Sequence, residues 1–446
     1  MKRRVVITGI GIVAPNGATA TEFWENCLAL QSSVQHIPQN WLNYWQPQSR
    51  LWAPLPSIDF DARGINRIER MQLDKSAILA ILSAQEALKN ANLHSKLIDE
   101  KKNLFFINGF SGDRTAIFMG TGIGGISSFA GNEGYHILSP LLNKLQKIAV
   151  SPDEFSDVVR APSRFNPFAV SMTMPNTCSA TLGIRFSITG PNRTVCNACA
   201  SGTMAIGQAF EAIVAGMADA ALAGGAEYLA DEYGGVFRGF DVAKTLVKQC
   251  DDPQTANRPF DRKRSGFLFA EGGSAVLVLE ELSQAQNRGA PIIAEVLSHA
   301  ETFDAHSVMS IDASARQIRR MISKALEEAN VLPGEIDYIN THGTSTEQND
   351  EIEAFTIESI FGTRPLINAT KALTGHTIGA AGAIETAVTA MSIARKTTHA
   401  CKNLDEPIRP LNFVTKSGPF EIKTAFTQSF AFGGHNAGLV LREFCS

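Results

Sequence analysis

The sequence predicts an α/β protein whose β-sheets are covered by helices on both faces. Short apolar runs rich in Val, Ile and Ala alternate along the chain with segments of helical periodicity. The strand-like runs are apolar almost throughout, which is typical of strands buried on both faces. The chain has 446 residues, of which 44% are hydrophobic and 19% charged, so it can bury the core of two large subdomains.

Strands are expected where β-branched residues cluster, and helices where apolar residues recur every three or four positions. The expected strands are Val5–Ile10, Thr115–Met119, Ala220–Gly224, Ser274–Glu280, Ile292–Leu297, Ile336–Asn340 and Gly438–Arg442. The expected helices are Lys75–Ala91, Ala200–Gly216, Ser314–Ala329 and Gly382–Ala394.

The first expected strand follows the basic start Met-Lys-Arg-Arg, an arrangement that secretory signal peptides share. Enrichment in Val and Ile, with Gly9 and Gly11 inside the run, favours a buried strand over a helical signal core. No uncharged apolar run reaches about 18 residues, so the sequence predicts no transmembrane helix.

A boundary between two units is expected near residue 285. The segment Arg288–Leu297 has the pattern of a loop followed by a new buried strand. We therefore divide the chain into residues 1–285 and 286–446, whose glycine-punctuated β/α patterns are similar. Leu104–Asp113 and Asn132–Pro162 carry little periodicity and are expected to be surface insertions. Gly235–Gly239 and Arg258–Asp261 are expected to be loops.

Cys199 is the strongest candidate nucleophile. It lies in Thr194–Thr203 (TVCNACASGT), directly ahead of the apolar segment Met204–Leu222. Unpaired backbone N–H groups and the helix dipole at such a helix start favour the thiolate, which is the reactive form of cysteine. The dipole contributes roughly 0.3–2 kcal/mol, about one pKa unit, so other residues must complete the activation.

Cys196 and Cys199 form a Cys-x-x-Cys pair, which also occurs in redox motifs and zinc sites. No second Cys or His pair has ligand spacing, and the small-domain context of a redox motif is missing. Cys196 is therefore expected to be a small buried hydrophobe. The odd number of cysteines, 7, argues against a disulfide framework and indicates a reducing compartment, which we take to be the cytoplasm.

Polar residues gather in glycine-rich loops of the C-terminal part. These loops hold His342, Lys371 with His376, and His435. A lone histidine is usually structural, but several in such loops beside a reactive cysteine point to catalysis. Asp350 and Glu353 follow at a spacing that places both on one helix face, which is either a solvated face or part of a site.

Binding of nucleotides, nucleic acids and membranes is not indicated. Gly120–Gly125 fits G-x-G-x-x-G, but Ser127–Gly134 is a poor helix sequence and no acidic residue follows at the required distance. The net charge of −4 gives no electrostatic argument for nucleic acid or membrane surfaces.

Together these segments resemble the β-ketoacyl-acyl-carrier-protein synthases, most closely the KAS II-like condensing enzymes, including the ketosynthases of type II polyketide pathways. The resemblance covers nearly the whole chain. It implies the α/β thiolase-like fold, in which two similar halves form a layered αβαβα core. The matching stretches are Val5–Gly11, Gly120–Gly125, Asn197–Gly202, Ala223–Glu227, Arg258–Asp261, Asn340–Thr346, Thr370–His376 and Phe430–Asn436.

The resemblance implies a catalytic triad of Cys199, His342 and His376. Cys199 would accept an acyl chain from an acyl carrier protein as a thioester. The two histidines would stabilise the enolate that forms when malonyl-carrier loses CO₂, and the enolate would attack the acyl group. This chemistry requires no metal and no organic cofactor.

The resemblance also implies supporting residues. Backbone N–H groups of Cys199 and Phe432 would form an oxyanion hole, and Phe432 would act as a gate. Lys371 would hold the polar network with Glu385 as its carboxylate partner, and Ile123 would limit the depth of the acyl pocket. Asp350 and Glu353 are weaker candidates for that network.

The implied partner is an acidic acyl carrier protein, which would meet a local basic rim formed by Arg67, Arg70, Arg238 and Lys244. A homodimer is expected, with a heterodimer containing a related subunit as the alternative. Thiolases need a second catalytic cysteine late in the chain, and Cys401 and Cys445 lie outside the glycine-rich loops. A non-catalytic, pocket-shaping subunit is disfavoured by the complete set of catalytic residues.

Four departures from the family pattern leave the acyl substrate open. The segment Asp304–Ile311 differs from the usual family loop, and Asn132–Pro162 is longer than in housekeeping KAS II enzymes. Gln428 replaces a common asparagine, and Ala431 replaces a glycine. These changes are compatible with either fatty acid or specialised polyketide synthesis.

Overall fold

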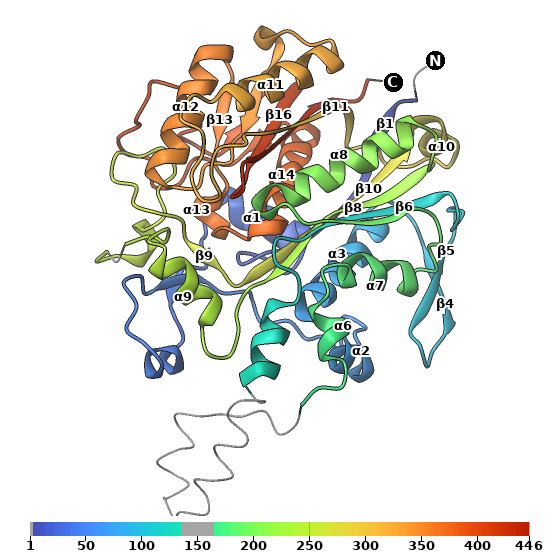
Figure 1. The fold of residues 1–446 in the computed structure, drawn as a ribbon. Helices are drawn as coiled ribbons and strands as arrows, with labels where there is room; N and C mark the ends of the chain where they lie inside the picture. Colours follow the sequence, from blue (N-terminus) through green and yellow to red (C-terminus); the bar gives the residue numbers. More distant parts are fainter. Residues whose placement is uncertain (1–2, 135–164, 249, 446) are drawn as a thin grey trace, which may run out of the picture.

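The computed structural model describes residues 3–134, 165–248 and 250–445. Its centre is a mixed ten-stranded sheet with the order β13-β12-β16-β17-β11-β1-β10-β8-β6-β7 (Figure 1). The strands of this sheet are β1 (Val5–Val13), β6 (Thr115–Gly120), β7 (Asn192–Val195), β8 (Ala220–Tyr228), β10 (Gly272–Glu281), β11 (Ala294–Phe303), β12 (Tyr338–Asn340), β13 (Leu366–Asn368), β16 (Thr424–Phe430) and β17 (His435–Arg442).

The sheet consists of two halves with the same topology. Read from its outer edge, the N-terminal half has the order β7-β6-β8-β10-β1, and the C-terminal half has the order β13-β12-β16-β17-β11. If the strands of each half are numbered along the chain, both orders are 3-2-4-5-1. The pairs formed by the third, second and fourth strands are parallel, and the remaining pairs are antiparallel. The halves meet at their first strands, where Val5–Ile7 pairs with Ala294–Val296.

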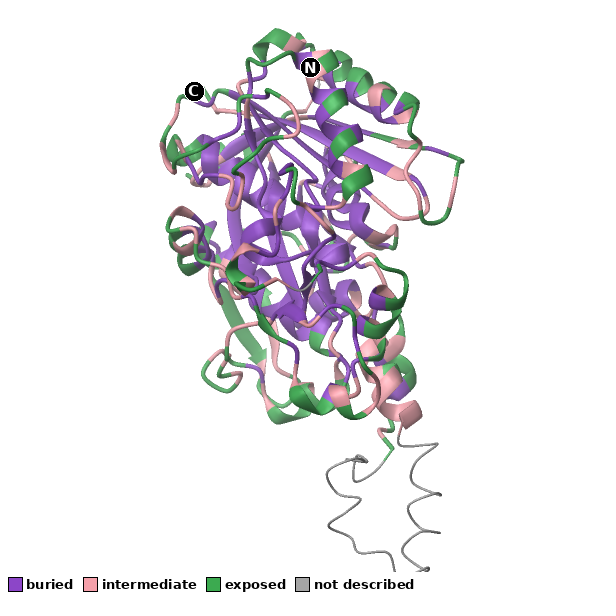
Figure 2. Cartoon of the chain, turned by 90° about the vertical axis from the view of Figure 1, so that its left-hand side faces the viewer, coloured by how far each residue is buried: buried purple, intermediate pink, exposed green. Residues whose placement is uncertain are grey.

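Helices separate the sheet halves and cover their outer faces. The helices α8 (Ser201–Val214) and α14 (Ala381–Arg395) share one core cluster with strands of both halves. On the outer faces lie α3 (Lys75–Asn90) and α7 (Thr177–Arg185) on one side, and α11 (Arg316–Ala329) and α12 (Glu347–Phe361) on the other. Buried residues run continuously through these layers (Figure 2). The predicted αβαβα layering of helices and sheets, which is that of the thiolase-like fold, is confirmed.

Smaller elements surround this core. The remaining helices are α1 (Ala20–Leu28), α2 (Arg67–Gln72), α6 (Ala169–Thr173), α9 (Gly235–Val242), α10 (Leu282–Asn287) and α13 (Lys371–Thr374). The remaining strands are β2 (Gln35–His36), β3 (Leu51–Ala53), β4 (Ser95–Asp99), β5 (Leu104–Ile107), β9 (Phe269–Ala270), β14 (Thr397–Thr398) and β15 (Gly418–Pro419).

The expected long helices and core strands are confirmed, but two local predictions are wrong. Leu104–Asp113 lies mostly at the surface, as expected, and contains β5, which forms a hairpin with β4. Residues 126–134 are helical, although their Ser, Gly and Asn content disfavours a helix. Gly235–Gly239 begins α9, whose Phe237 is buried among aromatic residues. In α9, burial of Phe237 outweighs weak intrinsic propensity, whereas residues 126–134 bury no side chain fully.

Two further expectations concern the insertion Asn132–Pro162 and membrane-spanning helices. Most of the expected insertion Asn132–Pro162 lies outside the described residues. No helix among the described residues has the length and apolar character needed to span a bilayer.

Candidate active site

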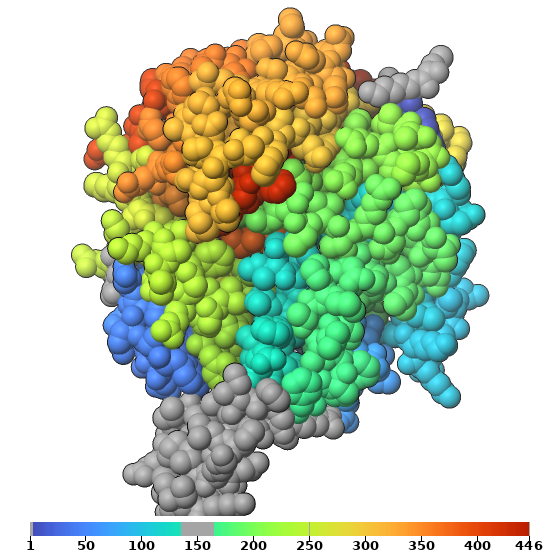
Figure 3. All heavy atoms as spheres, viewed as in Figure 1, coloured from blue at the N-terminus to red at the C-terminus, as the bar shows by residue number. Residues whose placement is uncertain are grey.

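Cys199 lies at the base of a cavity of about 460 Å³. The cavity opens between the two halves, where atoms from the C-terminal part of the chain are visible in a recess of the surface (Figure 3). Its walls combine aromatic residues with polar side chains of several loops. The residues that line it include Thr245, Phe267, Asp304, Met309, Ile311, His342, Thr344, His376, Phe430 and Phe432.

The Cys199 side chain is 3% exposed and belongs to the short 3-10 turn Ala198–Ala200, which leads into α8. Ser201 fixes this turn, because its Oγ accepts the N–H of Asn197 at 2.8 Å and donates to the Ala198 carbonyl at 2.7 Å. Ala198 has a φ of +46°, a left-handed conformation that is uncommon for a residue with a Cβ. The candidate nucleophile Cys199 thus lies on a tight turn that side-chain hydrogen bonds hold in place.

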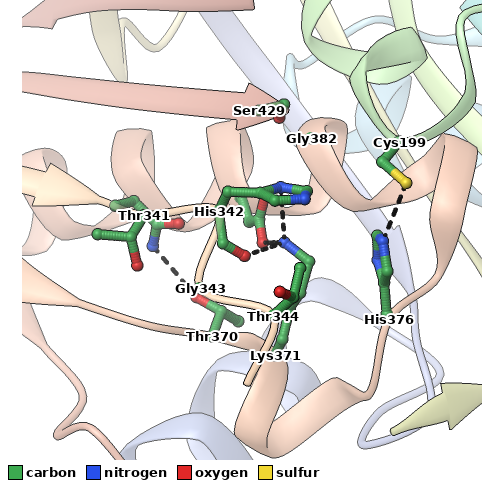
Figure 4. A network of polar contacts seen from close by, with 12 residues as sticks. Cys199, Thr341, His342, Gly343, Thr344, Thr370, Lys371, His376, Gly382 and Ser429 are labelled. Atoms are coloured by element: carbon green, nitrogen blue, oxygen red, sulfur yellow. Dashed lines mark hydrogen bonds and ion pairs between the residues drawn. The ribbon is translucent and has the colours of Figure 1, made fainter. Parts of the chain in front are cut away.

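The two predicted catalytic histidines, His342 and His376, approach Cys199 from the C-terminal half. His376 Nε2 lies 3.0 Å from Cys199 Sγ, and the ring centroids of His342 and His376 are 5.5 Å apart (Figure 4). Phe267 packs edge-on against His376 with a centroid separation of 5.3 Å and so fixes the plane of that ring. Topology brings together residues that are more than a hundred positions apart in the sequence.

Lys371 holds His342 from below. Its Nζ donates to the His342 carbonyl at 2.5 Å and lies 3.3 Å from His342 Nδ1 (Figure 4). The same ammonium forms an ion pair with Glu385 on α14, and both side chains are 2% exposed. An ammonium group has no lone pair to accept a proton, so contact with Nδ1 favours the tautomer of His342 that carries its proton on Nε2.

Burial controls the ionisation of the triad. Desolvation raises the pKa of Cys199 to about 12, opposed by the Lys371 charge and by the backbone N–H of Phe432. The expected preference for the thiolate is therefore wrong. A helix start lowers the pKa of a cysteine by only about one unit, and desolvation raises the pKa of Cys199 by more than that. Desolvation, together with the Lys371 charge, lowers the pKa values of His342 and His376 well below the usual range. The site holds a neutral thiol beside neutral imidazoles.

Comparison with known proteins identifies the family of this site. The family model described as "Beta-ketoacyl synthase, N-terminal domain" matches residues 2–285, and the corresponding C-terminal domain model matches residues 293–405. The chain belongs to the beta-ketoacyl synthase family. The resemblance expected from the sequence is thus confirmed.

Relatives of this beta-ketoacyl synthase match along their whole length. The chain is 32% identical to the 3-oxoacyl-[acyl-carrier-protein] synthase 2 of Synechocystis sp., covering 99% of both chains. The same identity is found to the synthase 2 of Coxiella burnetii, with coverage of 99% and 98%.

Solved structures of similar fold also cover 100% of both chains. A beta-ketoacyl synthase from Burkholderia phymatum has a TM-score of 0.83 at 29% identity. A ketosynthase in complex with its type II PKS acyl-carrier protein has a TM-score of 0.80 at 26% identity. The ishigamide ketosynthase/chain length factor has a TM-score of 0.81 at 26% identity.

Asp350 and Glu353 of this synthase are wholly buried, so the solvated-face alternative is wrong. Glu353 accepts the backbone N–H groups of His342 at 2.7 Å and Gly343 at 2.8 Å. Asp350 accepts those of Thr344 at 3.1 Å and of Phe260 at 2.7 Å. Both carboxylates therefore shape the loop that carries His342, and neither pairs with Lys371.

Phe432 and Ile123 both lie near Cys199. Phe432 is half-buried and lines the cavity, and its backbone N–H is directed at Cys199 Sγ. Ile123 does not line that cavity but packs against the apolar cluster that contains Cys199 and Ile378. The positions are compatible with the gate and pocket roles, which stay predictions.

The predicted basic residues are exposed but do not form one patch. Lys244 lies at the cavity mouth, and Arg238 is on α9. Arg67 and Arg70 are on α2, which is well separated from α9 in Figure 1. Arg70 is paired with Asp61 at 2.8 Å, which reduces its free charge.

Cys196 is exposed, so the prediction of a small buried residue is wrong. It follows β7 at the edge of the sheet, where its Sγ donates to the Gly122 carbonyl at 3.4 Å. Among the described residues, the one cluster with the geometry to hold a metal ion is the triad itself. Cys196 is not part of that cluster.

Several residues around the site were missed or left without a role by the sequence interpretation. Asp261 is wholly buried and pairs with Arg258, beside Phe260, so this expected loop is part of the support beneath His342. Gln428 donates to Glu353 at 2.8 Å. Glu227 accepts backbone N–H groups of Gly122 and Ile123 in the Gly120–Gly125 loop. Asp261 and Glu227 lie within stretches that match the family, and Gln428 is one of the departures from its pattern, but no local pattern indicates these contacts.

Proposed function

We propose that this protein catalyses the decarboxylative Claisen condensation of an acyl thioester on Cys199 with malonyl-acyl carrier protein, giving β-ketoacyl-acyl carrier protein. The observation that carries this proposal is the 3.0 Å contact between Cys199 Sγ and His376 Nε2, beside a second buried imidazole. A thiolate is both a good nucleophile and a good leaving group, and both properties are needed in a condensation that passes through a thioester.

In the acyl transfer, the sulfur of Cys199 attacks the carrier-bound acyl carbon while His376 Nε2 takes the thiol proton. For this role, neutral His376 must carry its own proton on Nδ1, so that Nε2 has a free lone pair to accept the thiol proton. The N–H groups of Cys199 and Phe432 stabilise the tetrahedral oxyanion. The carrier thiolate leaves, takes up the proton, and the acyl chain stays on Cys199. Because burial keeps the unreacted thiol neutral, proton transfer accompanies attack.

In the condensation, the bond from malonyl carbon to its carboxylate breaks, CO₂ leaves, and an enolate forms. Imidazole N–H groups of His342 and His376 stabilise the enolate oxygen, which requires His376 to carry its proton on Nε2 in this step. The enolate carbon then attacks the acyl carbon, the bond from that carbon to Cys199 Sγ breaks, and the released thiolate takes up one proton from solvent to restore the neutral thiol. Neutral imidazoles suit this role, because desolvation keeps their pKa values low.

Removal of the nucleophile tests this proposal directly. Incubation with an acyl carrier protein loaded with an acyl chain should increase the intact mass by one acyl group. Cys199→Ala should abolish the increase, because no thiol remains beside His376. Cys196→Ala is the matched control and should retain labelling, since this exposed thiol contacts only the Gly122 carbonyl. Persistent labelling of Cys199→Ala would sink the assignment, and so would a wild-type protein that never acylates.

The alternative is a non-catalytic subunit that shapes the pocket of a ketosynthase heterodimer. One similar structure is described as a ketosynthase/chain length factor, which makes this class of assembly relevant. The complete set of Cys199, His342, Lys371 and His376 in contact favours the catalytic alternative. The acylation experiment separates the two, since a non-catalytic subunit takes up no acyl group.

We propose that two copies associate through β7. Among the described strands, β7 pairs only with β6 and so ends the sheet. Its topological equivalent β13 is covered, because Ile367 exchanges backbone hydrogen bonds with Asn412 and Val414. An uncovered edge strand offers its outer N–H and C=O groups to another chain. A related subunit in place of the second copy is the alternative.

We further propose that the partner is an acidic acyl carrier protein that approaches the mouth of the cavity near Lys244. The odd cysteine count supports a reducing compartment, and we propose the cytoplasm. The boundary between the two structural halves is proposed near residue 285, in the connection between β10 and β11.

A further inference from the structure

Glu227 has no part in the steps above, although it is a wholly buried carboxylate at the centre of the molecule. Its Oε1 accepts the hydroxyl of Thr121 at 3.1 Å and the N–H of Ile123 at 3.3 Å. Its Oε2 accepts the N–H of Gly122 and, at 3.0 Å, that of Gly379. These four donors are neutral, and they come from two loops, one in each half of the chain.

Each loop is connected to a catalytic side chain. The single hydroxyl proton of Ser201 is shared between the Thr121 carbonyl, at 3.0 Å, and the Ala198 carbonyl, at 2.7 Å, in the turn that carries Cys199. Gly379 lies in the 3-10 turn Ile378–Ala380, three positions after His376. Glu227 therefore joins the turn of the nucleophile to the turn of its histidine partner.

The local backbone is built around this carboxylate. A Cβ at Gly122 would lie 2.7 Å from Glu227 Oε2, and a Cβ at Gly379 would lie 2.5 Å from it. Ile378 has a φ of +49°, a left-handed conformation that is a clear outlier for a β-branched residue. Such strain persists only where surrounding contacts hold it, and the adjacent Gly379–Glu227 hydrogen bond is one of them.

We propose that Glu227 is a positioning residue that sets the contact between Cys199 and His376 by holding their two turns together. The inference rests on the proposed role of Cys199 as the nucleophile. Glu227 acts through backbone N–H groups and does not touch the substrate.

The rate of Cys199 alkylation by iodoacetamide tests this inference and requires no carrier protein. The rate is followed between about pH 6 and pH 9 by mass spectrometry of the Cys199 peptide, in Glu227→Gln and in wild type. The glutamine amide turns N–H groups toward backbone donors, which should separate the two turns. We expect alkylation slowed by about tenfold or more, the size of one lost well-aligned hydrogen bond.

The direction of the change in alkylation rate distinguishes a role of Glu227 in positioning the two turns from an effect of its charge on Cys199. Burial raises the pKa of Glu227 to about 7, so above that pH its negative charge raises the pKa of Cys199, and removing the charge alone would make alkylation faster there. An unchanged or increased rate in folded Glu227→Gln therefore overturns the inference. Asp241→Asn is the matched control: it is a buried carboxylate that accepts the N–H groups of Gln48 and Ser49 outside the site, and the rate should stay within about twofold.

A milder variant keeps the inference testable if Glu227→Gln does not fold. Thr121→Val removes one of the four donors at nearly constant volume, and we expect alkylation slowed by about two- to fivefold. An unchanged rate in this variant overturns the inference as well. Failure of the condensing assignment would instead appear as missing acylation of Cys199 by carrier proteins, with the alkylation rates unaffected.

Discussion

Two opposing effects act on the Cys199 thiol, and their magnitudes decide its state. The helix start favours the thiolate by about one pKa unit, whereas burial raises the pKa of Cys199 to about 12. Burial is the larger effect, so the thiol needs a base in contact, and His376 at 3.0 Å meets that need. The dry surroundings that suppress the thiolate also strengthen the N–H groups that stabilise an oxyanion.

The same desolvation acts on the Glu353 carboxyl, whose titration should appear in the pH dependence of the free energy of unfolding. Burial raises its pKa from the ordinary value of 4.5 to about 7. A carboxyl whose pKa is higher in the folded state stabilises the fold below about pH 4.5, and this stabilisation is lost as the pH rises to about 7. We expect the stability of wild type relative to Glu353→Gln to fall by about 2–3 kcal/mol between about pH 5 and pH 8.

Urea unfolding at several pH values measures this difference. Glu347→Gln is the control, because Glu347 is an exposed carboxyl on the same helix, α12, and should leave the pH dependence unchanged. Parallel stability curves for wild type and Glu353→Gln would show that the buried carboxyl does not titrate in this range.

At the scale of elements, the close contact of α8 and α14 at the centre of the molecule positions the turn of Cys199 and the carboxylate that pairs with Lys371. Cys199 precedes α8, and Glu385, the partner of Lys371, lies on α14. The helices touch through small residues: a Cβ at Gly382 would lie 2.1 Å from Thr203 Oγ1. A larger residue here would separate the helices or distort their ends.

We therefore expect Gly382→Ala to lower the free energy of unfolding by about 1–3 kcal/mol, the usual cost of overpacking a core. Gly239→Ala is the matched control. Gly239 is in α9, and a Cβ there meets no atom within 4 Å, so alanine should stabilise by up to about 1 kcal/mol through helix propensity. Urea unfolding midpoints check both, and an unaffected Gly382→Ala would show that the two helices can move apart freely.

At the scale of the whole molecule, the two equivalent halves differ at their outer edges. The edge of β13 is covered by the segment Asn412–Val414, while β7 ends the sheet of described strands. The carbonyls of Pro191 and Val195 bond to β6, so the backbone groups of Asn192 and Thr194 face outward. The proposed association of two copies depends on these outer groups.

We expect Thr194→Pro to convert a dimer into a monomer, because it removes an outward N–H without breaking the ladder to β6. Thr194→Val is the control: it loses the same hydroxyl contact with Ser179 but keeps the N–H and should remain a dimer. Light scattering after size exclusion gives the mass. A Thr194→Pro protein that stays dimeric would place the interface elsewhere.

The sequence by itself determined the alternation of strands and helices and the family, and it predicted Cys199, His342 and His376 as candidate catalytic residues. Apolar periodicity and short motifs are local properties, and they survive without knowledge of distant contacts. The tertiary structure decided the ionisation of Cys199, the burial of Asp350 and Glu353, and the place of Glu227 between two loops. Those properties depend on desolvation and on hydrogen bonds between residues up to about 150 positions apart, which no local pattern encodes.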